Sequence, residues 1–227
     1  MDTLPFELKK LIFTFSLNPK ELRLVSKEFY YISKLDSTKA EWILKRAGKD
    51  KALDKETLQS FPWISNARIL TLLVQKNSNF TVDHYFSLRM SASEGYVESA
   101  ETIVDRGGDV HALRNHSLHL ATYNGHLQLV KFLVEKGADI HSMQNYALRW
   151  ASYQGHVEIV AYLIEKGANV FALDNNALFL ASYQFTKQRE SKYLQIMRLL
   201  LLNGCDPDVI DSLREREYSI PFVIVKN

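Results

Sequence analysis

A thirty-residue internal repeat constrains this chain more than any other feature of its sequence. The stretch 145–170 reads NYALRWASYQGHVEIVAYLIEKGANV. Gly125 recurs one repeat later as Gly155, and Gly137 recurs as Gly167 after the same step. A period of about 20 to 50 residues is typical of arrays of stacked repeats. The sequence therefore predicts a repeat protein built from thirty-residue units.

Each unit predicts two short helices. Leu148, Ala151 and Ser152 form a narrow stripe at helical spacing, and Gly155 follows where the end of a helix favours a left-handed residue. A second apolar pattern at 157–164 ends near Gly167. A single helical hairpin cannot bury its apolar face, so neighbouring copies must stack into a continuous core. Leu133 is one predicted position in that core.

Two copies carry a family resemblance. Residues 124–140 (NGHLQLVKFLVEKGADI) and 154–170 (QGHVEIVAYLIEKGANV) resemble the second helix and turn of ankyrin repeats almost residue for residue. The usual ankyrin repeat has about 33 residues and opens with Thr-Pro-Leu-His, of which only His119 remains here. The resemblance implies an all-α solenoid of stacked helical hairpins, with shorter tips between its units than usual.

The predicted ankyrin array spans residues 66–210. It opens with a degenerate copy at 66–84, continues with copies at about 85–114, 115–144 and 145–174, and ends with a copy at 175–210. The last copy contains a polar insertion at 185–192, FTKQRESK, which predicts either an extended loop or an added helical turn. This insertion could contact a partner or be a tolerated surface addition. Residues 211–227 are expected to form a C-terminal cap.

The first 35 residues predict a separate helical unit. LPFELKKLIF at 4–13 and LRLVSKEFYYI at 22–32 resemble the two ends of an F-box motif, although the segment 17–25 is a few residues shorter than in that family. F-box proteins dock on a Skp-type linker protein, which joins them to a cullin ubiquitin ligase. The matching positions are Leu4, Pro5, Leu8, Ile12, Leu22, Val25 and Phe29. The alternative is that these helices only cap the repeats.

Composition narrows the remaining classes of function. The net charge is +2, and the basic residues of the predicted helical linker 36–65 are diluted by acidic ones and lack aromatic partners. These features argue against a nucleic-acid site. Cys205 is the only cysteine, which excludes an internal disulfide and a cysteine-based zinc site and favours a reducing, intracellular setting. No apolar run is long enough to cross a membrane.

The sequence offers no constellation for catalysis or cofactor binding. His116 and His119 are three residues apart, but a zinc ion needs further ligands. His126 and His156 each follow a turn glycine and are explained by the repeat. No phosphate-binding glycine loop, nucleophile elbow or zinc-protease helix is visible. We therefore expect a protein without enzymatic activity, metal or cofactor.

A recognition surface remains as the candidate site. Tyrosine stands immediately before the turn in three copies, and in ankyrin repeats these positions face the concave groove, as do the tips. Tyrosine offers a large contact area and a polar end, which suits an interaction hot spot. The alternative is that the rings pack on one another along the stack. The predicted target-binding residues are Tyr123, Asn124, Tyr153, Gln154, Tyr183, Gln184, Arg114, Gln144 and Asp174.

Together these features predict an adaptor, without enzymatic activity, that links a target protein on the ankyrin face to a cullin-type ubiquitin ligase. The target is not identified by the sequence, and a monomer is expected. Similar domain combinations occur in large DNA viruses and intracellular parasites, so the resemblance implies a viral protein in the host cytoplasm or nucleus. The alternative is a plain ankyrin scaffold or competitive inhibitor with no link to a ubiquitin ligase.

Overall fold

The computed structural model describes residues 36–53, 56, 67–76 and 78–208. Within these residues all regular structure is helical, which confirms the all-α prediction for this part of the chain. The helices are α4 (Asp36–Ala47), α6 (Ala67–Gln75), α7 (Val82–Glu94), α8 (Val97–Asp105), α9 (Ala112–Tyr123), α10 (Leu127–Glu135), α11 (Ser142–Gln154), α12 (Val157–Glu165), α13 (Ala172–Gln188) and α14 (Ser191–Leu202). The predicted F-box-like segment 1–35, with all its docking residues, and the predicted cap 211–227 lie outside the described residues.

The chain divides into two compact units, of which the first comprises Met1–Ser91 with Tyr96–Asp109. In this unit α6 packs against both α4 and α8, and its residues Ile69 and Leu73 are completely buried. The Ser99 hydroxyl of α8 donates a hydrogen bond to the Ala67 carbonyl at 2.8 Å. Helix α6 lies within the range predicted for the degenerate first copy, although the boundaries of the copies stay predictions.

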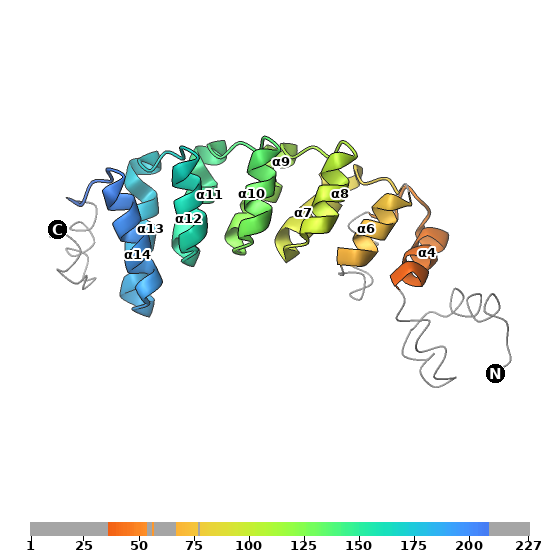
Figure 1. Cartoon of the computed structure of the whole chain (residues 1–227), viewed down its shortest axis with the longest axis horizontal. Coiled ribbons are helices and arrows are strands. Elements are labelled where there is room, and N and C mark those ends of the chain that lie inside the picture. Colours follow the sequence, from red (N-terminus) through yellow and green to blue (C-terminus); the bar gives the residue numbers. More distant parts are fainter. Residues whose placement is uncertain (1–35, 54–55, 57–66, 77, 209–227) are drawn as a thin grey trace, which may run out of the picture. The chain divides into compact units, whose positions relative to one another are not determined.

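The second unit comprises Ala92–Gly95 with Val110–Asn227, and its described residues form stacked helical hairpins. The outer helices α10, α12 and α14 lie in front of the inner helices α9, α11 and α13 (Figure 1). Each inner helix packs against the outer helix that follows it, and neighbours contact each other within each row. Leu133 is completely buried in the resulting core, as predicted.

The turn between the inner and outer helices requires glycine for two reasons. Gly155 ends α11 in the left-handed conformation with φ 85°, as predicted. Gly125 has φ 82°, and a Cβ atom there would lie 2.6 Å from Cε1 of His156 in the next repeat. The imidazole Nε2 of His156 is 2.9 Å from the carbonyl oxygen of Tyr123, so this nitrogen carries the proton and donates. His126 makes the same bond to the carbonyl of Ser93 at 2.9 Å.

The tips between successive repeats are left-handed turns, which the sequence did not predict. Three consecutive non-glycine residues have φ between 50° and 62° at each of the three tips of the second unit. They are Leu113, Arg114 and Asn115, then Met143, Gln144 and Asn145, then Leu173, Asp174 and Asn175. This conformation costs an L-residue roughly 1–2 kcal/mol. Other interactions must therefore hold the tips.

The last asparagine of each tip supplies such an interaction. Asn145 is buried at 5% exposure, and its side-chain oxygen accepts a hydrogen bond of 2.8 Å from the backbone N–H of Asn169, just before the next tip. Asn115 accepts an equivalent 2.8 Å bond from the N–H of Asp139. Asparagine also tolerates the left-handed conformation better than most residues. Each tip is thus bonded forward to the segment that leads into the next tip, whereas the turn histidines bond backward to the preceding repeat.

The insertion in the last copy forms helix rather than a loop. Helix α13 continues to Gln188, and Arg189 takes the left-handed position with φ 58° that glycine holds elsewhere. The Gln188 amide donates a 3.0 Å hydrogen bond to the side-chain oxygen of Gln184, and the Tyr193 hydroxyl donates to Gln188 at 3.3 Å. Of the two predicted alternatives, the added helical turn is therefore the correct one.

Candidate functional site

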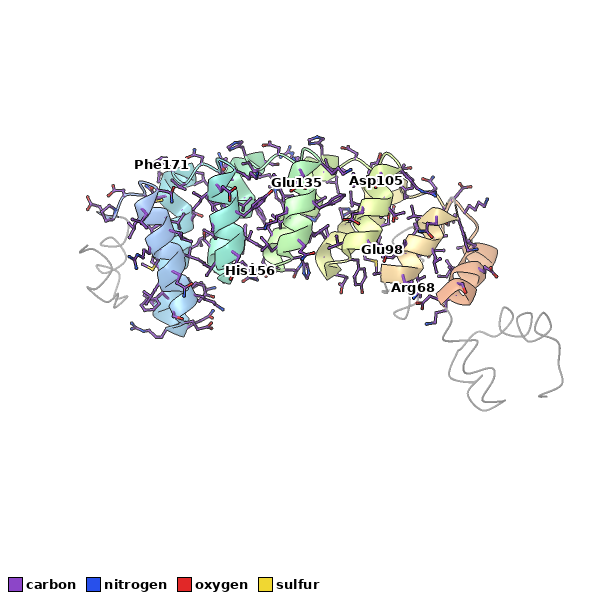
Figure 2. All side chains as sticks on the ribbon, viewed as in Figure 1. Arg68, Glu98, Asp105, Glu135, His156 and Phe171 are labelled. Carbon is purple, nitrogen blue, oxygen red and sulfur yellow. The ribbon has the colours of Figure 1, made fainter. Side chains whose placement is uncertain are left out.

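The predicted tyrosines occupy equivalent places on the three inner helices of the second unit. Tyr123 is 40% exposed, and Tyr153 and Tyr183 are half-buried. Each lies at or near the turn end of its helix, which is the end opposite the tips. Two labelled residues mark these ends in Figure 2. His156 lies at the turn end of the second unit, and Phe171 lies at a tip.

An aromatic cluster connects two of these tyrosines. We define it as Tyr123, Tyr146, Trp150 and Tyr153. The ring of Trp150 lies 5.7 Å from that of Tyr123, 5.5 Å from Tyr146 and 5.1 Å from Tyr153, with an edge-to-face angle of 71° in the last pair. The tyrosines therefore contact one another through the indole, as the packing alternative anticipated in part. The half-buried Trp150 was not among the predicted site residues.

His119 lies beside this cluster and contributes a neutral, buried imidazole. Its ring is 4.6 Å from that of Tyr146, and only 4% of the residue is exposed. Burial, followed by repulsion from His116 and Arg149, lowers the pKa of His119 to about 4. Its buried Nε2 has no hydrogen-bond partner among the described residues. A ligand atom reaching this nitrogen would satisfy it.

Two cations flank the aromatic rings. The Arg149 guanidinium lies 5.7 Å from the centre of the Tyr146 ring, and its Nε and Nη2 donate to the carbonyls of Gln144 and Met143, each at 3.1 Å. The arginine thus supports a strained tip while placing positive charge beside the cluster. Lys187 Nζ lies 5.6 Å above the ring of Tyr183.

The other predicted face residues differ in accessibility. Arg114, Gln144 and Asp174 are exposed at the tips, and Asn124 is exposed at the turn end. Gln154 is half-buried. Gln184, by contrast, is only 7% exposed, because the added helical turn covers its side chain. Gln184 therefore does not belong to the accessible surface.

The described residues offer no arrangement for metal binding or thiol chemistry. No group of three histidine, cysteine or acidic residues among them could hold a metal ion. Cys205 is buried, and burial raises the pKa of its thiol to about 11. A thiol of that pKa is almost entirely protonated at neutral pH and is a poor nucleophile.

The comparison with protein families identifies the repeats. Residues 118–211 match the family model described as "Ankyrin repeats (3 copies)", which confirms the resemblance for this segment. A comparison with curated proteins found no significant match. Among the described helices, none combines the length and apolarity needed to span a bilayer. Ankyrin repeats act in general as scaffolds for protein–protein interaction and not as enzymes, so this segment implies protein partners.

Proposed function

We propose that this chain is an adaptor without enzymatic activity, which holds a target protein on the inner helices of its ankyrin repeats. The aromatic cluster carries the proposal. Tyrosine, tryptophan and arginine dominate interaction hot spots, and here Tyr123, Trp150 and Arg149 lie together on packed helices. A rigid frame keeps the entropy cost of binding low, because few side chains need to be ordered.

The N-terminal segment gives the adaptor its proposed second partner. Residues 1–35 resemble an F-box, so we propose that they dock on a Skp-type linker protein of a cullin ubiquitin ligase. Such an adaptor accelerates transfer by proximity alone, since tethering can raise the target's effective concentration to about the millimolar range. A viral origin and an intracellular location belong to the same proposal. This part is supported only by the sequence pattern of Leu4, Pro5, Leu8 and Phe29 and their neighbours.

Mutation of the face tests target binding. We expect the double variant Tyr123→Ala, Trp150→Ala to lose its captured protein partners, because the change removes the centre of the cluster. Phe171→Ala is the matched control, since Phe171 is 54% exposed at a tip outside the cluster. Partners would be compared by mass spectrometry after affinity purification. Equal recovery by the double variant and wild type, with both folded, would refute binding at this face.

Co-purification tests the link to the ubiquitin ligase. The intact chain should bind a purified Skp-type protein, and Leu8→Glu, Phe29→Ala should abolish binding without changing the circular dichroism spectrum. Failure of the folded intact chain to bind would exclude the ligase role. The protein would then be the plain ankyrin scaffold or competitive inhibitor of the alternative hypothesis.

A further inference from the structure

The inner and outer helices of the second unit differ in charge. The right-handed parts of the inner helices, at 116–123, 146–154 and 176–188, contain no aspartate or glutamate, but they contain Arg149 and Lys187. The outer helices α10, α12 and α14 carry both signs of charge, with Glu135, Glu158 and Glu165 beside Lys131, Lys192 and Arg198. The aromatic cluster therefore lies on helical segments whose formal charges are positive, although the exposed Asp174 stands at the tip that leads into α13.

The indole and the cationic groups on this face are hydrogen-bond donors, whereas the tyrosine hydroxyls can both donate and accept. Indole and guanidinium groups can donate hydrogen bonds but cannot accept them. Trp150 and Arg149 bring such groups to the cluster, and Lys187 adds an ammonium group. Arg149 also donates to the carbonyls of Gln144 and Met143 and, at 3.5 Å, to the side-chain oxygen of Asn176. A complementary partner must therefore supply acceptors, and a carboxylate is the strongest acceptor that a protein offers to these cations.

We infer that the partner binds through an acidic segment whose carboxylates pair with Arg149 and Lys187 and whose apolar anchor rests on Trp150. This inference rests on the proposed function and names the chemical class of the target. A single-stranded nucleic acid is also anionic and could stack on the rings. Two cations, however, provide little for a continuous phosphate backbone.

The chain offers a closely matched pair of variants for the test. Lys187 lies 5.6 Å above Tyr183 on an inner helix, and Lys131 lies 5.7 Å above Tyr162 on the outer side. Lys187→Glu and Lys131→Glu change the net charge equally and each remove one lysine–tyrosine contact. Only Lys187→Glu reverses charge on the proposed binding face.

The experiment selects binders of the intact chain from a random peptide library and sorts them by dependence on Trp150. Peptides that lose binding to folded Trp150→Ala, or to the milder Tyr123→Ala, should contain more Asp and Glu than Lys and Arg. Their affinity should fall about three- to tenfold for Lys187→Glu and with added salt, but should be unchanged for Lys131→Glu. An oligouridine probe should not bind.

The outcomes separate this inference from the function on which it rests. Trp150-dependent peptides without an acidic excess, or with equal responses to the two lysine variants, would overturn the acidic class and leave the binding face intact. Absence of any peptide that depends on Trp150 or Tyr123 would overturn both. Oligouridine binding that requires Trp150 would replace the acidic segment with a nucleic acid.

Discussion

Replacement of Asn145 by alanine tests how the left-handed tips are held. The change removes the side-chain oxygen that accepts the 2.8 Å bond from the Asn169 N–H and lies 3.3 Å from Nδ1 of His141. Asn169 is an exposed residue and this bond is part-buried, so its loss costs about 0.5–1.5 kcal/mol. Alanine at φ 56° adds roughly 1–2 kcal/mol that asparagine largely avoids. We expect Asn145→Ala to lower the free energy of unfolding by about 1.5–3.5 kcal/mol.

Three companion variants separate these contributions. Asn145→Gly also removes the hydrogen-bond acceptor, but glycine adopts the left-handed backbone conformation without strain. This variant should therefore be less destabilising than Asn145→Ala by about 1 kcal/mol. Asn145→Asp keeps an acceptor and should remain closer to wild type. Asn175→Ala should cost less than Asn145→Ala, because Asn175 is half-buried and its bond to the Asp206 N–H is longer, at 3.3 Å.

Urea denaturation followed by circular dichroism gives the free energies, and hydrogen exchange reports the Asn169 amide directly. Protection of that amide should fall in both Asn145→Ala and Asn145→Gly and persist in Asn145→Asp. A typical intramolecular hydrogen bond contributes at least about 0.5 kcal/mol net. A smaller loss in Asn145→Ala, with Asn169 still protected, would refute the forward hydrogen bond as the support of the tip.

The other predictions concern the core, the turn and pH. Leu133→Ala should lower the free energy of unfolding by about 2–5 kcal/mol, since Leu133 is completely buried, and urea denaturation measures this. By the same assay Gly125→Ala should destabilise more than Gly137→Ala, because only at Gly125 would the new Cβ atom collide with His156. The pKa of His119 is lowered from 6.5 to about 4 in the folded chain. As the pH falls, this imidazole is therefore protonated in the unfolded state before it is protonated in the folded state. Wild type should lose stability from about pH 6.5 to pH 4, and folded His119→Phe should lose less over that window in thermal melts.

The helical frame could be read from the sequence because its signals are local. The apolar spacing in 157–164 and the glycine at 155 act within one helix and its own turn, and the structure has α12 and a left-handed Gly155 where they were predicted. Burial of Leu133 followed from the same periodicity. The family resemblance at 124–140 and 154–170 rested on these residues too.

The features that were not predicted depend on contacts that the local helical pattern does not encode. Nothing within Met143 and Gln144 favours a left-handed backbone, and the bond that compensates comes from Asn169, which is 24 residues beyond Asn145. Trp150 replaces a leucine found one repeat away on each side, at Leu120 and Leu180, which is a signal that could have been noticed. Burial of Gln184 depended on whether the insertion would form helix or loop.

The forward asparagine bonds and backward histidine bonds also govern which changes of length this chain can tolerate. Removal of residues 125–154 would place Gly155 directly after Asn124, so His156 would meet the carbonyl of Ser93 and Asn115 would meet the amide of Asn169. The hydrogen bonds at the new boundary between repeats would then be formed by equivalent residues. A deletion whose length is not a multiple of thirty residues would put the donors and acceptors out of phase. Whole repeat units are therefore the natural steps by which such a chain can gain or lose binding surface during evolution.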